Sequence, residues 1–173
     1  MGESFYMCKS NEISILVGQI DKAFSWRKKP DSLTNSHELT TDELFDIIKF
    51  SKLSWQETTS SLWEKHFDVI HFFIPEAFKY FLPGILKASI MDNTPSLIVC
   101  EDLIPSLNRS PNYHGWETYF LERWEGFTID EYNVLDEWLL WQSNFMTSQE
   151  ESLSLSIAMR TLEILKNKTK KFL

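Results

Sequence analysis

The chain has 173 residues and a formal net charge of -8, with 43% hydrophobic and 24% charged residues. This balance excludes intrinsic disorder, and the length suits one domain, 1–173, around one core. The negative charge argues against binding to nucleic-acid backbones, which reward Lys and Arg, and leaves a basic protein as the favoured kind of partner.

The cysteine content and the N-terminal sequence predict a soluble cytoplasmic protein. Cys8 and Cys100 are far apart and belong to no metal-binding or redox motif, so we expect two free thiols in a reducing compartment. The N-terminus lacks the basic start and apolar run of a secretory signal, and no stretch is apolar over the length of a membrane span. We therefore expect no association with a membrane.

The low glycine content, 5 residues, favours helices over folds that need many turns with positive φ. The first predicted helix covers residues 11–26. Its apolar residues recur at helical spacing and are expected to face the core: Ile13, Leu16, Val17, Ile20, Ala23 and Phe24. The sequence predicts a mainly α, compact domain of about six helices.

A second helix is predicted to begin after Thr40, because Thr40 and Glu43 form a capping-box pattern. The residues expected to line its buried side are Leu44, Phe45, Ile47, Ile48 and Leu53. A short helix over residues 60–66 would follow.

The segment FFIPEAFKYFLPGIL, residues 72–86, is the densest aromatic stretch of the chain. Pro75 suits the first position of a helix, where its missing N–H has no intrahelical partner anyway. Pro83 is expected to end that helix or to begin the next one.

Glu76 allows two interpretations. Among phenylalanines, a carboxyl group could have a raised pKa and act as a general acid or base, which suggests a hydrolase or transferase site with His71 and His66. Directly after Pro75, it could instead stabilise the positive end of a helix, which needs no further assumption and is favoured.

No sequence motif assigns chemistry. The glycine-rich phosphate loops and the nucleophile elbow are absent, and His66 and His71 are five residues apart, which places them off a common helical face. We therefore predict no catalytic residue, no metal site and no cofactor.

The C-terminal half is predicted to be mostly helical. SLIVC, residues 96–100, has the composition of a strand but is equally compatible with a buried helix, so a short strand pair stays open. Residues 105–115 are expected to form a loop. Capping-box patterns at Thr128 with Glu131 and at Thr147 with Glu150 predict two further helices, the last of them running through Leu153, Ile157, Leu162 and Leu165.

An acidic stretch carries the leading functional hypothesis. From residue 117 to residue 151 there are nine acidic residues and one basic residue, Arg123. This pattern is typical of a solvated helix surface, but with aromatic anchors it also suits electrostatic binding of a basic protein. The predicted interaction surface consists of Trp116, Glu117, Tyr119, Glu122, Trp124, Glu125, Asp130 and Glu137.

Three segments resemble a bacterial family of unknown function. They are residues 20–24, residues 75–86 with the pattern PEAF-x-Y-x-LP, and residues 127–140. The chain departs from the family pattern at Gly84 and Ile85. The resemblance implies no catalytic residue, and small acidic helical proteins of this kind are often interaction or immunity-type proteins. The leading hypothesis is thus a non-enzymatic, immunity- or antitoxin-like protein that binds a basic partner.

Overall fold

The computed structural model describes residues 2–36 and 38–171, with side chains from residue 12 onward. Over these residues the chain is mainly helical and forms no strand, which confirms the mainly α prediction, although the helices are more numerous than the six expected. The elements are α1 (Gly2–Phe24), α2 (Thr41–Ser51), η1 (Trp55–Glu57), α3 (Ser60–Lys65), α4 (Val69–Phe72), α5 (Pro75–Met91), α6 (Ile98–Ser106), η2 (Tyr113–Gly115), α7 (Thr118–Trp124), α8 (Ile129–Ser143) and α9 (Gln149–Lys170).

Helix α5 is the centre of the fold and contacts α1, η1, α3, α6 and α7. Pro75 occupies its first turn as predicted, but the helix continues through Pro83, so the prediction that Pro83 ends it was wrong. A proline inside a helix costs about 3 kcal/mol or more. That cost is offset because the residues beyond it, including Ile85, Leu86 and Ile90, are fully buried, each worth roughly 1.5 to 3 kcal/mol.

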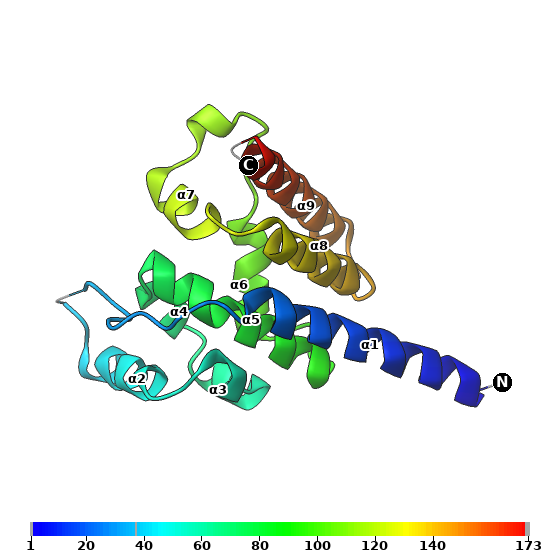
Figure 1. The fold of residues 1–173 in the computed structure, drawn as a ribbon, viewed down its shortest axis with the longest axis horizontal. Coiled ribbons are helices and arrows are strands. Elements are labelled where there is room, and N and C mark those ends of the chain that lie inside the picture. Colours follow the sequence, from blue (N-terminus) through cyan, green and yellow to red (C-terminus); the bar gives the residue numbers. More distant parts are fainter. Residues whose placement is uncertain (1, 37, 172–173) are drawn as a thin grey trace.

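Helices α1, α8 and α9 pack side by side, and α1 also covers α5 (Figure 1). Helix α1 begins at Gly2, earlier than the predicted residue 11. Of its six predicted core residues, Leu16, Ile20, Ala23 and Phe24 are buried, and Ile13 and Val17 are partly buried against the core. No helix in the described part of the chain is both long enough and apolar enough to cross a membrane.

Helix α2 begins with the predicted capping box, in which the Thr40 N–H donates to Glu43 Oε2 at 2.6 Å. The prediction of its buried face was mostly wrong. Ile47 and Phe50 are buried, whereas Leu44, Phe45 and Ile48 are 48%, 62% and 45% exposed. The reason is that α2 packs mainly against α4, a single short helix, and therefore buries only a narrow stripe.

The apolar run at residues 96–100 leads into α6, which begins at Ile98, so the strand alternative is wrong. The capping box of Thr128 with Glu131 is present as predicted. That of the last helix lies one residue later than predicted, at Ser148 with Glu151, because the Ser148 hydroxyl accepts the Glu151 N–H at 3.1 Å.

Candidate functional site

A pocket of roughly 650 Å³ lies between α6, the end of α8 and the first turns of α9, and we call it the α6–α9 pocket. A cleft of this size accommodates a small ligand or a few side chains of a partner. Its apolar lining includes Ile104, Phe145, Met146, Leu153 and Ile157.

Two side-chain hydrogen bonds fix the walls of the pocket. Asn108, just after α6, donates from Nδ2 to Ser154 Oγ on α9 at 2.8 Å. Gln142, near the end of α8, donates from Nε2 to the Pro95 carbonyl at 3.3 Å. The first bond joins the end of α6 to α9, and the second joins α8 to the segment before α6. The two bonds therefore link walls of the pocket that are distant in sequence.

The rim of the α6–α9 pocket carries negative charge. Glu101 on α6 and Glu150 on α9 are exposed, and neither forms an ion pair with a described residue. Glu151 accepts hydrogen bonds from the backbone N–H groups of Thr147 and Ser148, which lower its pKa. Among the described residues, no Lys, Arg or His lines this pocket. The pocket therefore combines apolar walls with a rim of carboxylates.

Cys100 also lines the pocket, but its thiol is not a nucleophile. The side chain is buried, and burial raises its pKa from 9.0 to about 12, so the thiol stays protonated near neutral pH. The side chain of Cys8 lies outside the described residues.

The tryptophans of the predicted interaction surface belong to the core. Trp116 and Trp124 are 7% and 3% exposed. The indole Nε1 of Trp116 donates to the Ser110 carbonyl at 2.9 Å, and the ring of Trp124 lies 5.1 Å from that of Phe78. They are therefore not on the surface where the sequence analysis placed them. Tyr119, at 56% exposed, is the aromatic residue of that set that faces solvent.

The acidic residues of the predicted surface fall into two groups. Glu117 lies 3.3 Å from Arg109 Nε, and Glu125 accepts the Tyr113 hydroxyl bond and lies 3.7 Å from Lys168 Nζ. The second group is exposed and forms no ion pair with any described residue: Glu122, Asp130 and Glu137. The second group is therefore exposed to a partner and has no ion pair among the described residues to give up.

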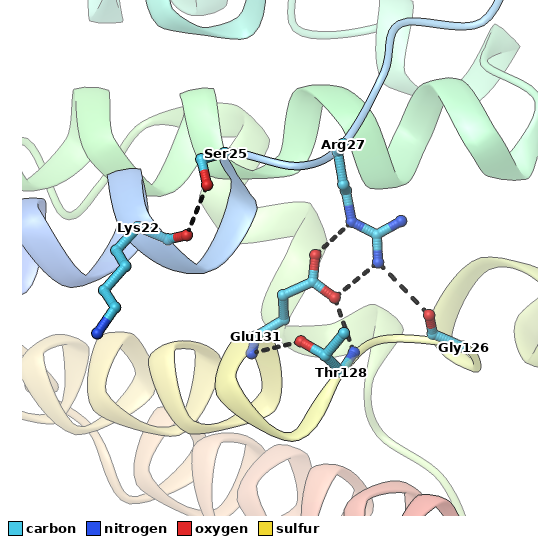
Figure 2. Close-up of polar contacts among 6 residues, drawn as sticks. All are labelled: Lys22, Ser25, Arg27, Gly126, Thr128 and Glu131. Atoms are coloured by element: carbon cyan, nitrogen blue, oxygen red, sulfur yellow. Dashed lines mark hydrogen bonds and ion pairs between the residues drawn. The ribbon is translucent and has the colours of Figure 1, made fainter.

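Glu131, counted by sequence among the acids of this region, is fully buried and binds Arg27 (Figure 2). Arg27 Nε and Nη2 lie 2.5 and 2.8 Å from the two carboxylate oxygens. The same carboxylate accepts the Thr128 N–H at 2.7 Å. This bidentate pair joins the segment after α1 to the start of α8, and no sequence signal links two residues so far apart.

Glu76 lies in the first turn of α5, is exposed and lines neither of the two described pockets. This is the placement expected of a carboxylate that stabilises a helix N-terminus.

The histidines of the enzymatic hypothesis have separate partners. His66 Nδ1 lies 2.8 Å from Asp46, and its Nε2 lies 2.9 Å from Lys49 Nζ. His71 Nε2 lies 3.4 Å from Asp102 at the surface. The structure does not bring His66, His71 and Glu76 into one pocket. The described residues contain no cluster of His, Cys, Asp or Glu suited to a metal ion.

No family model, curated protein or solved structure matches this chain. The resemblance through residues 75–86 therefore stays a prediction, and function is argued from the geometry of the molecule.

Proposed function

We propose that the protein is a non-enzymatic interaction protein that binds a basic, amphipathic segment of another protein in the α6–α9 pocket. The observation that carries the proposal is the pairing of apolar walls with a rim of carboxylates and no lining cation among the described residues. The net charge of -8 favours the same class of partner. Neutralising a basic partner, in the manner of an immunity or antitoxin protein, is the role that such binding would serve.

The pocket offers separate contacts to the apolar and to the basic residues of an amphipathic segment. Ile104, Phe145 and Ile157 offer contacts to an apolar side chain, and Met146 adapts its shape to different partners. Leu153 is 61% exposed and extends the apolar contact to the rim. Burial of these side chains supplies affinity.

Glu101 on α6 and Glu150 on α9 are both exposed and both line the pocket. A Lys or Arg side chain can lay its methylene stem along the apolar wall while its charged end meets a carboxylate. Two acids on different helices of the pocket therefore favour a segment that carries basic residues beside apolar ones.

The proposal keeps the basic partner expected from the composition and moves the contact away from α7 and α8. Glu122, Asp130 and Glu137 contribute to the negative field that speeds the approach of such a partner, without touching it.

The test uses two synthetic helical peptides of equal length, one of leucine and lysine and one of leucine and glutamate. We expect saturable binding of the lysine peptide, weakened by added salt, and no binding of the glutamate peptide. The double variant Glu101→Lys, Glu150→Lys should weaken binding by roughly tenfold or more. The matched control, Glu122→Lys with Glu137→Lys, changes the net charge equally and should have a much smaller effect.

Fluorescence anisotropy of the labelled peptide measures these affinities, and a Leu153→Ser variant tests the apolar contribution. If the two double variants lose the same affinity for the lysine peptide, the effect comes from net charge alone, and the pocket is not the binding site. A loss of affinity only in Glu122→Lys with Glu137→Lys would show that the peptide binds at α7 and α8 instead. Complete competition by a simple alkylamine would identify the pocket as a small-molecule site instead.

A further inference from the structure

A second cleft, of roughly 60 Å³, lies where α4, α5, α6 and α7 meet, and we call it the arginine cleft. Its lining includes His71 of α4, Phe78 of α5, Asp102 of α6, Arg109 of the following loop, and Arg123 of α7. A space of this size holds about two waters, or one small ion in their place.

Arg123 is 8% exposed, and its guanidinium is only partly satisfied. Nη1 donates to the Tyr119 hydroxyl and Nη2 to the Ile70 carbonyl, both at 2.6 Å, while Cζ lies 4.1 Å from the centroid of Phe78. The Nε atom is buried and has no acceptor. Burial lowers the pKa of Arg123, and Tyr119 opposes this shift.

Arg123 forms no ion pair with a carboxylate of the described residues. Burying a charged group without a counterion is costly. Arg27 of the same protein has a counterion. Its side chain is 11% exposed, and it binds both carboxylate oxygens of Glu131. Arg123 is comparably buried and lacks such a partner, which singles it out.

Arg109 adds a second positive charge to the cleft. Its Cζ lies 4.3 Å from the Phe120 ring centroid, and its Nη1 donates to the Asn108 carbonyl at 3.0 Å. Glu117, 3.3 Å from Arg109 Nε, has a side chain that is 70% exposed and does not line the cleft.

The other acidic or basic side chains that line the cleft are His71 and Asp102. Their side chains are 52% and 45% exposed, and they face each other at 3.4 Å. Asp102 is therefore the one carboxylate among the described lining residues, set against two arginines. The lining of the cleft therefore has an excess of positive charge, although the net charge of the protein is -8.

We infer that the arginine cleft binds a small oxyanion, the carboxylate or phosphoryl group of a ligand, which supplies the negative charge and acceptors that Arg123 lacks. The planar guanidinium matches both groups in geometry. The cleft is lined by Asp102 and Leu103, whereas the α6–α9 pocket is lined by Glu101 and Ile104, so the two sites stand on different residues of α6. The inference is independent of the proposed function.

The test is calorimetric titration with inorganic phosphate and, separately, with acetate, at low ionic strength. We expect saturable binding of at least one of them at a single site. Arg109→Gln should weaken it by roughly tenfold. Lys65→Gln is the matched control, because it removes one positive charge from an exposed position outside the cleft and should leave the affinity nearly unchanged.

Binding of phosphate alone would assign a phosphoryl group to the site, and binding of acetate alone a carboxylate. A rise in the unfolding midpoint with the bound anion, lost in Arg123→Lys, would place the ion at the buried guanidinium. If Arg123→Lys does not fold, the Arg109→Gln titration decides alone. Absence of saturable binding, or equal affinity in Arg109→Gln, would overturn the inference and leave water as the occupant.

Discussion

At the scale of single residues, the bond between Arg27 and Glu131 couples two chain segments through charges that are almost withdrawn from solvent. Cζ of Arg27 also lies 4.8 Å from the ring centroids of both Trp26 and Phe127. The guanidinium therefore contacts two aromatic rings as well as the carboxylate. Removing the carboxylate alone would leave a positive charge in an apolar setting.

We predict that Glu131→Met lowers the free energy of unfolding by roughly 3 to 5 kcal/mol, because it leaves Arg27 buried without its partner. Urea denaturation measures the change. Glu137→Met, the same substitution at an exposed position of α8, should stay within about 0.5 kcal/mol of the parent.

The double variant Arg27→Met, Glu131→Met should recover part of the stability lost in Glu131→Met, since it removes the unpaired charge as well. Equal midpoints for Glu131→Met and Glu137→Met would show that the pair contributes nothing to the fold.

Phenylalanines of the same chain differ sharply in what they contribute. Phe81 is fully buried and its ring lies 5.1 Å from that of Phe73, whereas Phe45 is 62% exposed. We predict that Phe81→Ala lowers the free energy of unfolding by about 3 to 5 kcal/mol. Phe45→Ala should change it by less than about 0.5 kcal/mol. Similar losses in a thermal or urea melt would mean that the aromatic residues of α5 are not the centre of the core.

At the scale of elements, the contact between α5 and η1 depends on a missing side chain. A Cβ at Gly84 would lie 2.7 Å from the Trp55 carbonyl oxygen and would also collide with the Thr58 side chain. Since one of these groups is backbone, it cannot simply rotate away. Gly84 therefore allows η1 to lie directly on the central helix.

Two glycine-to-alanine substitutions test this packing. Gly84→Ala should destabilise the fold by about 1 to 3 kcal/mol through overpacking. Gly18→Ala, on α1, meets nothing within 4 Å and should stabilise the protein by about 0.5 to 1 kcal/mol, because alanine favours the helix. Opposite signs in paired denaturation curves are the expected result, and the same sign for both would contradict the close approach of η1.

The elements that the sequence predicts well are those set by local chemistry. The capping boxes at Thr40 and Thr128 depend on residues three positions apart, and both are present. The local sequence pattern does not predict burial or helix ends where packing against another element determines them. Leu44 and Ile48 are apolar at helical spacing yet exposed, because α2 packs mainly against one short helix. Pro83 lies within a helix because burial on every side outweighs a local preference.

The candidate sites were harder to predict for the same reason. The walls of the α6–α9 pocket come from three separate segments, and nothing in any one of them marks a cleft. Sequence correctly indicated an excess of acids but could not separate the free Glu122 from the buried Glu131. An arginine that lies alone among acids, Arg123, was the one signal of the second cleft.

At the scale of the whole molecule, the stability of the fold should depend on pH at its alkaline end. Cys100 has its pKa raised to about 12 by burial, from 9.0, and burial also raises the pKa of Tyr132. Each group keeps its proton longer in the folded than in the unfolded chain. Their contribution is therefore full below pH 9 and is lost as the pH rises toward the folded values.

We predict that the free energy of unfolding falls steadily above about pH 9, and that the fall is shallower in Cys100→Ala. Urea titrations at a series of pH values measure the slope, which a general loss of packing in the variant would not change. Identical slopes in the two proteins would show that Cys100 is not held protonated by the fold.

The link between Arg27 and Glu131 also bears on how the chain assembles as it is made. The two residues are 104 positions apart, and α1 packs on α8 as well as on α5. At about 5 to 20 residues per second, roughly 5 to 20 s pass between the synthesis of one partner and that of the other. Throughout that interval the apolar stripe of α1 lacks one of the helices that cover it. A nascent chain of this protein therefore exposes part of that stripe, to chaperones or to neighbouring chains, until α8 has been synthesised.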